Sequence, residues 1–252
     1  TMGGQTALNV SMELAKEGIL KKNNVKMIGA NPDAIELAED RQKIKDAMRE
    51  IGLKCPKSVI VEELSRIDPS FGVMFCVHVG LCAKTISLHG NEQQKSKYLP
   101  RLAAGEVGAY SLSEAGAGTD AAAMICKAKL SEDGSHFILN GEKMWVTNGA
   151  QAKILVLFAK DVDHPDYGVK RHGGTTAFIV ESNFEGFTVG KKEDKLGIRS
   201  SDTCTLVLND CKVPVENVLK GIGNGFPIAM NALDNSRTVS YTHLRAHETS
   251  YD

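Results

Sequence analysis

The sequence is poor in aromatic residues, and it lacks both a strong excess of one charge and a run of about twenty apolar residues. Aromatic residues make up 6% of the 252 positions, and Trp145 is the only tryptophan. The 30 Lys and Arg residues nearly balance the 31 Asp and Glu residues and are scattered, which disfavours nucleic acid as a partner. We expect no signal peptide and no membrane. With 42% hydrophobic residues the chain is typical of a globular protein, and small-molecule chemistry is the favoured class of function.

Paired cysteines are also missing. No two cysteines form a C-x-x-C pair, and their spacing does not suit a metal site. Several lie in apolar runs, where a free thiol behaves as a small hydrophobic side chain. We therefore expect a reducing compartment, the cytoplasm, and no metal. The cysteines are Cys55, Cys76, Cys82, Cys126, Cys204 and Cys211.

The first 58 residues are expected to form a short α/β unit. A helix with apolar residues at helical spacing ends at Gly18. A strand from Val25 to Ile28 and a turn at Pro32 follow, and a second amphipathic helix runs from Ile35 to Ile51. The chain opens without an initiator methionine, so we expect that its start is not the native one.

From Val59 the pattern predicts nearly continuous helix through Leu88, and then a second helix from Glu92 to Ala104. After Tyr110 the apolar residues recur with a period of two, which predicts β-strands. These strands are Cys126–Leu130, Phe137–Leu139, Lys143–Thr147, Ile154–Phe158, Thr175–Val180, Phe187–Lys192 and Thr203–Leu208.

Two dipeptides, Asp133-Gly134 and Asn140-Gly141, predict tight hairpin turns, because glycine accepts positive φ without a Cβ clash. The region is therefore predicted to be an antiparallel β domain. A last helix begins near Pro227 and is expected to end at Arg237, where the sequence becomes polar and aperiodic.

Two segments suit a flat ligand. Tyr110 to Asp120 combines hydroxyl side chains with Gly116 and Gly118, so backbone N–H groups can approach a ligand closely. Trp145 and Thr147 lie two apart, so on a strand they place an aromatic plane and a hydroxyl on one face, as the edge of an isoalloxazine ring requires. Taken singly, a solvated glycine loop explains the first segment better, and a tryptophan packed in the core explains the second at least as well.

Two further segments, Asp194 to Thr203 and Asp234 to Arg237, each place an arginine beside hydroxyl or carboxylate groups. A solvated turn and a helix surface account for either one alone. In order, the segments YSLSEAGAGTD, NGEKMWVTNG, DKLGIRSSDT and ENVL with GIGNGF resemble the signature series of acyl-CoA dehydrogenases of the short-chain, butyryl type, over residues 59–237.

This resemblance implies an α+β protein with FAD as the cofactor. The family has a helical N-terminal domain, here expected at 59–107, a β middle domain, here 108–225, and a C-terminal helical bundle, of which only 226–237 would be present. The family is a homotetramer that oxidises an acyl-CoA thioester and passes electrons to electron-transfer flavoprotein. The tetramer is built largely by that bundle.

The resemblance also assigns site residues. Flavin would contact Tyr110, Leu112, Ser113, Gly118, Thr119, Trp145 and Thr147. Thr119 would also border the thioester, with Asp234 and Arg237 in the acyl-CoA site. Arg199 and Ser200 are expected near the cofactor, and Ala115 stands where many relatives have proline.

In this family a glutamate removes the α proton while the β hydrogen leaves as hydride to flavin N5, which needs a carboxylate of raised pKa in a dry pocket. The family's glutamate lies in the C-terminal bundle. Neither Glu114 nor Glu142 matches it. We therefore expect no catalytic residue in this chain, and little or no dehydrogenase activity.

Both ends resemble something else. Residues 1–58 resemble the large subunit of carbamoyl-phosphate synthase, in which Arg41 would sit at a nucleotide-contacting position of an ATP-grasp fold. Residues 238–252 resemble a translated sequencing adaptor and are expected to be disordered; His243 and His247 there share helical spacing but have no third metal ligand nearby. The chain is thus interpreted as a chimera. An ATP-grasp ligase fragment and a non-catalytic β-domain binding module are the alternatives.

Overall fold

A computed structural model describes residues 13–23, 25 and 65–244, with side chains through Asp234. The chain divides into two compact units, residues 1–58 and 59–252, and each is described by itself.

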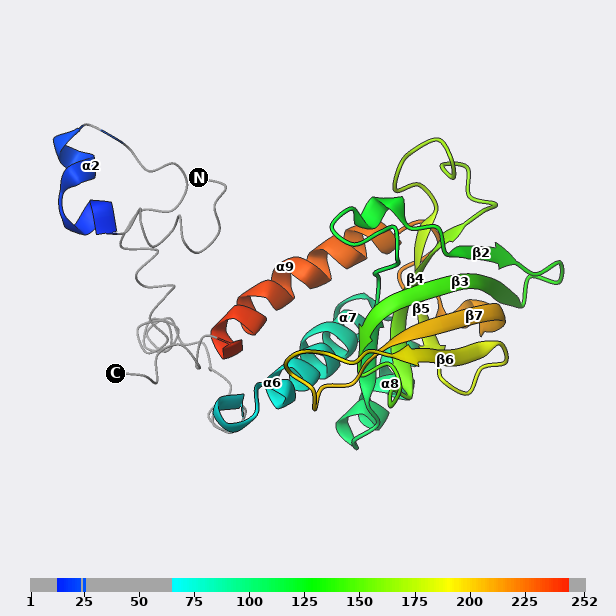
Figure 1. The fold of residues 1–252 in the computed structure, drawn as a ribbon. Helices are drawn as coiled ribbons and strands as arrows, with labels where there is room; N and C mark the ends of the chain where they lie inside the picture. Colours follow the sequence, from blue (N-terminus) through cyan, green and yellow to red (C-terminus); the bar gives the residue numbers. More distant parts are fainter. Residues whose placement is uncertain (1–12, 24, 26–64, 245–252) are drawn as a thin grey trace. The chain divides into compact units, whose positions relative to one another are not determined.

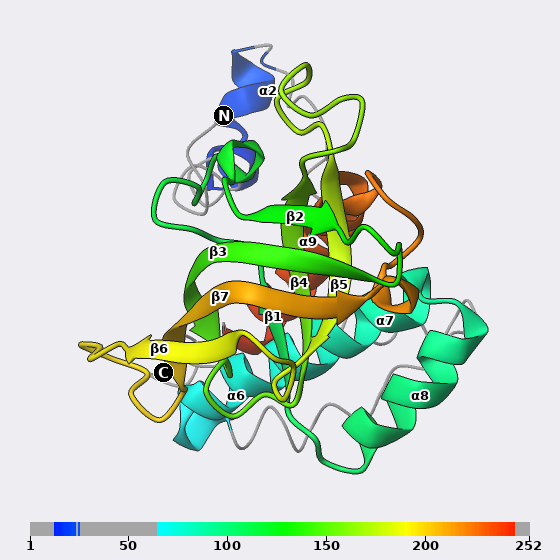
Figure 2. The same ribbon diagram turned by 90° about the vertical axis from the view of Figure 1, so that its right-hand side faces the viewer.

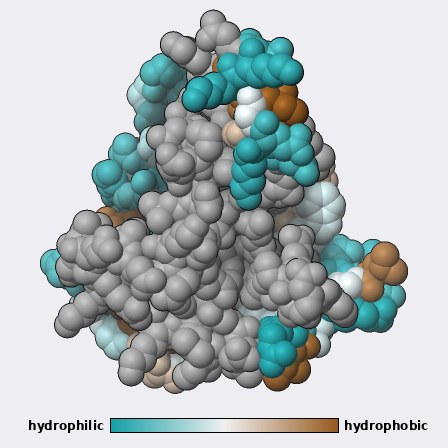
Figure 3. All heavy atoms as spheres, turned by 90° about the vertical axis from the view of Figure 1, so that its left-hand side faces the viewer, coloured by the Kyte–Doolittle hydropathy of each residue, from teal (hydrophilic) through white to brown (hydrophobic). Residues whose placement is uncertain are grey.

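The described part of the first unit is a short helical segment. One turn at residues 13–16 is followed by Gly18 in the left-handed conformation, with φ of 71°. The helix is interrupted there as predicted, but a further turn, α2 (Ile19–Lys22), follows without a separate signal in the sequence. This segment is mainly hydrophilic, with a small hydrophobic group (Figure 3). The predicted strand beyond Val25, the second helix and Arg41 lie outside the described residues.

The described part of the second unit contains, after a helical turn at residues 65–67, one long helix in three parts: α6 (Pro69–Phe75), η1 (Cys76–Ala83) and α7 (Lys84–His89). Asp68 caps its start by accepting a hydrogen bond from the Ser70 amide at 2.9 Å. The middle part, η1, is a π-helix. The helix ends at His89, one residue beyond the predicted Leu88, whereas the predicted start at Val59 lies outside the described residues.

This helix, from Pro69 to His89, is long and apolar enough by length and composition to cross a membrane. The expectation that the chain contains no such segment is therefore wrong. The apolar character of the segment is hard to recognise in the sequence, because Gly72, His78, Gly80 and Lys84 interrupt the apolar run. One side of the helix packs in the protein, where Cys82 and Ile86 are fully buried.

The second helix, α8 (Glu92–Ala103), was predicted almost to the residue. Asn91 and Gln94 form a capping box: each side chain accepts a hydrogen bond from the other residue's amide, at 2.8 and 3.0 Å. The buried Tyr98 hydroxyl then donates to Asn217 at 3.0 Å, and Arg101 pairs with Glu181 at 2.7 Å. These contacts fix α8 to the β domain.

The β domain is a curled sheet of seven strands in the order β1-β4-β2-β3-β7-β6, with β5 on the other side of β4 (Figures 1 and 2). The antiparallel strand pairs are β2–β3, β3–β7, β6–β7 and β4–β5. The strands are β1 (Gly108–Ser111), β2 (Lys127–Leu130), β3 (His136–Thr147), β4 (Ile154–Asp161), β5 (Thr175–Glu181), β6 (Phe187–Lys192) and β7 (Thr203–Pro214).

The α+β class is confirmed, but three details differ from the sequence prediction. β1 was not predicted as a strand, and its pairing with β4, like that of β2 with β4, is parallel rather than antiparallel. The Asn140-Gly141 dipeptide is not a hairpin turn, because β3 is continuous and only shifts register between Leu139 and Gly141. Here the glycine accommodates a bulge instead of a turn.

Two apolar cores lie on the two faces of the sheet. The first consists only of β-domain residues, among them Phe137, Phe178 and Leu206. The second joins the helices to the other face, where Ile86 and Tyr98 meet Ile154 and Ile179. Helices α6 to α9 therefore cover one side of the sheet (Figure 1).

The last helix, α9 (Gly225–Leu244), is longer than predicted. The expected end at Arg237 is wrong, since the helix continues into the segment expected to be disordered. From Ile228 onward the sequence contains neither glycine nor proline, so no residue forces the helix to stop. His247 lies outside the described residues, and the His243 side chain is not described.

The described cysteines are buried and form no disulfide: Cys76, Cys82, Cys126, Cys204 and Cys211. Burial raises the pKa of Cys126 and Cys204 to about 11. The described residues hold no group of three metal-ligating side chains. The cytoplasmic location stays a prediction.

Candidate functional site

The glycine-rich loop begins inside the protein and ends at its surface. Tyr110 and Leu112 are buried, and the Tyr110 ring packs against Phe158 with centroids 5.2 Å apart. Among the described residues, the buried hydroxyls of Tyr110 and Ser111 have no hydrogen-bond partner. Burial raises the pKa of Tyr110, so the phenol stays protonated and keeps a donor available. Buried polar atoms normally find a partner, so these two mark a place where a ligand can supply one.

The loop then makes a narrow turn. The amides and carbonyls of Glu114 and Ala117 bond reciprocally, at 3.1 and 3.0 Å. Beyond the turn, Gly118 and Thr119 are exposed. A Cβ added at Gly116 or Gly118 would meet no atom within 4 Å, so the protein itself does not occupy the space beside these glycines. The open space suits close approach of a ligand to the backbone.

Strand β3 is hydrogen-bonded to this loop through two consecutive residues. The Lys143 ammonium is fully buried and donates to the Glu114 carboxylate at 2.7 Å and to the Leu112 carbonyl at 3.1 Å. The next residue, Met144, donates its amide to the Ser113 carbonyl at 2.9 Å. The backbone of the predicted flavin contacts Leu112 and Ser113 is thus tied to the strand that carries Trp145.

Trp145 points away from the core. Its side chain is 58% exposed and its φ is 55°, at a register shift of β3 between Lys143 and Val146. The interpretation of Trp145 as a core residue is therefore wrong. Val146 is buried and Thr147 is half-buried, so the exposure alternates as the predicted pairing of Trp145 with Thr147 requires. An indole ring held in the open beside a glycine loop is a stacking surface.

The segment around Arg199 lies next to the end of β3. Thr203 is paired with Thr147, and the Asp202 side chain accepts a hydrogen bond from the Ala150 amide at 2.8 Å. Arg199 itself forms an exposed ion pair with Asp194 at 2.9 Å. Ser200 is exposed, and the Arg199 guanidinium faces this local partner, so their place near the cofactor stays a prediction.

The two acyl-site candidates lie on α9. Asp234 is exposed on this helix, whereas the side chain of Arg237 is not described. The helix packs beside the loop, because Ala232 shares a core cluster with Tyr110 and Ala117. The structure thus brings the flavin-loop and acyl-site segments into one region, although no direct contact between their predicted site residues is observed among the described side chains.

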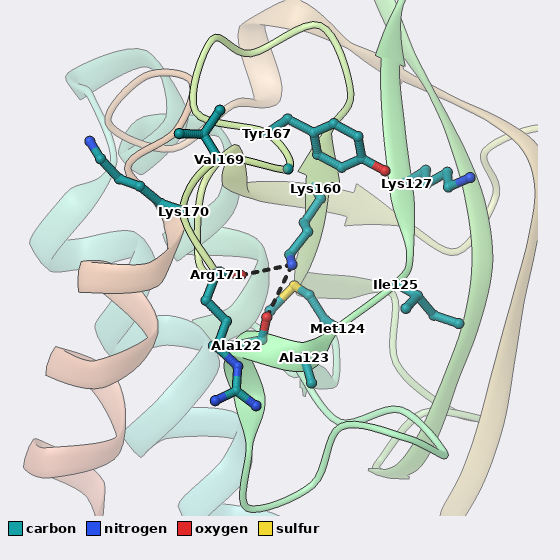
Figure 4. Close-up of a pocket in the computed structure, with 11 residues that line it drawn as sticks. Ala122, Ala123, Met124, Ile125, Lys127, Lys160, Tyr167, Val169, Lys170 and Arg171 are labelled. Atoms are coloured by element: carbon teal, nitrogen blue, oxygen red, sulfur yellow. Dashed lines mark hydrogen bonds between the residues drawn. The ribbon is translucent and has the colours of Figure 1, made fainter.

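A cationic pocket of about 520 Å³ opens beyond Thr119. Residues from the segment after the loop, from the end of β4 and from the connection between β4 and β5 form its walls (Figure 4). Lys160 lies at its base and donates to the carbonyls of Ala122 and Arg171, at 3.0 and 2.9 Å. The pocket is lined by Ala122, Ala123, Met124, Ile125, Lys127, Lys160, Tyr167, Gly168, Val169, Lys170 and Arg171.

An ion pair connects this pocket to the glycine-rich loop. Arg171 forms an ion pair with Asp120, the residue after Thr119. Lys127 and Lys170 add further positive charge to the same walls. A concentration of cations beside a glycine-rich loop favours an anionic ligand.

The sequence interpretation missed Lys143 and the cationic pocket. A signal existed for Lys143, because it follows Phe137 and Leu139 at every second position, on the buried face of the strand. A lysine at a buried position requires a carboxylate partner. No such signal existed for the pocket, since Lys127, Lys160 and Arg171 come from separate segments.

Models of two domains match this chain. The acyl-CoA dehydrogenase N-terminal domain matches residues 40–106, and the acyl-CoA dehydrogenase middle domain matches residues 109–211. The first match starts upstream of residue 58, where a change of family was expected. The resemblance of the front piece to carbamoyl-phosphate synthase and that of the tail to an adaptor stay predictions.

Curated relatives agree with the domain matches. The chain is 48% identical over 180 residues to a short-chain specific acyl-CoA dehydrogenase of Clostridium acetobutylicum, covering 71% of this chain and 46% of that protein. It is 44% identical over 182 residues to mitochondrial isovaleryl-CoA dehydrogenase of Pongo abelii, covering 72% and 42%. The chain therefore spans less than half the length of these relatives.

Solved structures show the same arrangement. Butyryl-CoA dehydrogenase from Megasphaera elsdenii superposes with a TM-score of 0.67 at 42% identity, over 74% of this chain and 46% of that one. An acyl-CoA dehydrogenase complexed with FAD from Bacillus anthracis gives 0.68 at 32% identity, over 96% and 43%. A chain in a structure of the electron transferring flavoprotein of Acidaminococcus fermentans gives 0.68 at 40%, over 82% and 56%.

Proposed function

Because this chain belongs to the acyl-CoA dehydrogenase family, we propose that it forms the flavin-binding part of an FAD-dependent oxidoreductase acting on the CH–CH bond of an acyl-CoA thioester. When bound, FAD supplies the acceptor for the hydride that leaves the β carbon. The chain's own contribution is to bind the cofactor, to orient the substrate and to keep water away from both.

Trp145 carries the proposal, because its indole is exposed on the strand that is bonded to the open glycine loop. Its ring would stack on the flavin, with the Thr147 hydroxyl at the polar edge. The buried hydroxyls of Tyr110 and Ser111 would supply hydrogen bonds that now lack a partner. Backbone N–H groups near Gly118 would approach the cofactor where no side chain intervenes.

The acyl-CoA thioester would enter from the other end of the loop. Thr119 is exposed at that point, and the pocket lined by Lys127, Lys160, Lys170 and Arg171 would attract the phosphates of coenzyme A. Asp234 and Arg237 on α9 would border the acyl part. This orientation places the thioester between the cationic pocket and the Trp145 surface.

The proton at the α carbon needs a base, and the carboxylates near the loop do not suit this task. Glu114 is 3% exposed and accepts hydrogen bonds from Lys143 and from two backbone amides. Glu142 is exposed to water, whereas this task needs a dry pocket. We propose that another residue supplies the base, so that the isolated chain turns over acyl-CoA poorly.

Electron-transfer flavoprotein is the proposed acceptor of the electrons from the reduced flavin. The similarity to a chain in the electron transferring flavoprotein structure of Acidaminococcus fermentans supports this assignment. A homotetramer, as the family resemblance implies, stays a prediction.

Titration of the purified chain with FAD tests the proposal, because Trp145 is its only tryptophan. We expect quenching of its fluorescence and a dissociation constant of about 1 µM or weaker, since stacking and a few hydrogen bonds must offset the cost of association. Trp145→Ala should weaken binding without lowering the unfolding temperature, whereas Trp145→Phe should retain most of it. Unchanged binding by Trp145→Ala would place the flavin elsewhere.

A further inference from the structure

The ion pair between Lys143 and Glu114 is unusual for its depth. The two side chains are 0% and 3% exposed, and their charged atoms lie 2.7 Å apart. Lysine and glutamate are almost never fully buried unless they are paired, because removal of a charge from water is costly. No other ion pair within residues 65–234 has both partners so deeply buried.

The pair joins three segments of chain. Lys143 on β3 donates to the Leu112 carbonyl, and Glu114 accepts from the amides of Ile125 at 2.6 Å and Cys126 at 3.2 Å. The loop, the strand with the indole and the segment entering β2 therefore meet at these two charges. This junction lies between the two parts of the proposed flavin surface.

Stability alone does not require such a pair. Replacement of a buried ion pair by apolar residues of similar volume is often neutral or stabilising, while removal of one partner is strongly destabilising. The charges instead fix orientation, because a buried ammonium and a buried carboxylate each align several backbone hydrogen-bonding groups at once. An apolar pair would fill the same volume without aligning the carbonyl of Leu112 or the amides of Ile125 and Cys126.

We infer that Lys143 and Glu114 are positioning residues for the cofactor, fixing the glycine-rich loop at the spacing from Trp145 that a flat ligand between them requires. The inference rests on the proposed function, but it makes a separate statement about the loop itself. Without the pair, the loop keeps its sequence and its hydroxyls and loses its alignment with the indole ring.

The test uses the full chain and the apolar double variant Lys143→Met/Glu114→Met, because Lys143→Met alone leaves a buried carboxylate unpaired and can prevent folding. We expect the double variant to unfold at about the temperature of the parent. Its dissociation constant for FAD should rise about tenfold, as expected when one or two net hydrogen bonds lose their alignment. Amide hydrogen exchange should accelerate at Ala117, Ile125, Cys126 and Met144 and remain unchanged in the other strands.

The double variant Arg101→Met/Glu181→Met is the matched control, because it also removes an ion pair, here between α8 and β5, and lies outside the proposed site. It should leave FAD affinity and exchange at the loop unchanged. Parent-like exchange at the loop of the double variant would overturn the inference, and so would parent-like FAD affinity. If the parent chain bound no FAD, the proposed function would fail, and the exchange data alone would then decide whether the pair holds the loop.

Discussion

The Nδ1 atom of His78 accepts a hydrogen bond from the Gly108 amide at 2.9 Å, joining the long helix to the first residue of β1. Gly108 could hardly be another residue, since an added Cβ would lie 2.9 Å from the Cys82 sulfur. The bond requires Nδ1 without a proton, so it fixes the neutral imidazole. The helical layer and the sheet are therefore joined through a group that titrates.

This contact predicts that the protein loses stability in weak acid. Burial lowers the pKa of His78 from its ordinary value of 6.5, so below that value the unfolded chain binds the proton more readily. The stability that the neutral His78 contributes is complete above about pH 6.5. It is lost as the pH falls from about 6.5 through the lowered pKa of His78 in the folded protein. Urea unfolding at about pH 7.5 and about pH 5.5 measures the difference.

His78→Gln should show a smaller loss of stability between these two pH values than the parent protein. His89, whose pKa is also lowered by burial, retains part of the pH dependence in the variant. Equal slopes for the parent and His78→Gln would remove this histidine from the explanation.

Turn chemistry predicted one connection of the sheet correctly and misplaced another. The same kind of dipeptide, Asp133-Gly134 and Asn140-Gly141, forms a turn between β2 and β3 in the first case and a bulge in the second. Both glycines have positive φ, of 69° and 145°. The local sequence indicates that each of these positions needs glycine. Whether the strand turns back there depends on the distant strand β7, which pairs with β3 on both sides of Gly141.

Gly141 predicts a large effect of a small substitution. An alanine Cβ would lie 2.9 Å from the Cys126 Cα atom, and φ of 145° already disfavours a side chain. Gly141→Ala should lower the free energy of unfolding by about 2–4 kcal/mol. Gly197→Ala is the control, since nothing lies within 4 Å of its Cβ position. Its effect should stay within about 0.5 kcal/mol, and a similar loss in both variants would contradict the explanation.

The candidate site was predictable only in part, because the local sequence does not show which distant segments meet in the fold. Motifs along the chain point to Trp145 and to the loop before Thr119, because each is a continuous segment. The Lys143–Glu114 bond and the cationic pocket depend on strands that come together from distant positions. Burial parity could have signalled Lys143, but nothing local identifies Glu114 as its partner.

The buried thiols predict slow chemical modification. Cys126 and Cys204 are fully buried, and burial raises the pKa of each to about 11, so little thiolate is present and little of it is accessible. Iodoacetamide at about pH 8 should leave both unmodified in the folded protein and alkylate both in urea. Peptide mass spectrometry locates the label. Alkylation of Cys126 at equal rates with and without urea would show that this part of the core is open.

The cationic pocket predicts that coenzyme A binds with an affinity that falls as salt is added. Two lysines of the pocket should contribute to this affinity. Lys127 and Lys170 line the pocket, and Lys170 is exposed and paired with Asp166 at 2.9 Å. Lys127→Gln/Lys170→Gln should raise the dissociation constant of coenzyme A about three- to tenfold at low ionic strength, and less in salt, because screening already weakens exposed charges. Lys191→Gln/Lys212→Gln also removes two exposed lysines, paired with Glu193 at 3.8 Å and Glu185 at 2.9 Å, from other strands and should leave the affinity unchanged. If calorimetry gave the same weakening for both proteins, net charge rather than the pocket would attract the phosphates.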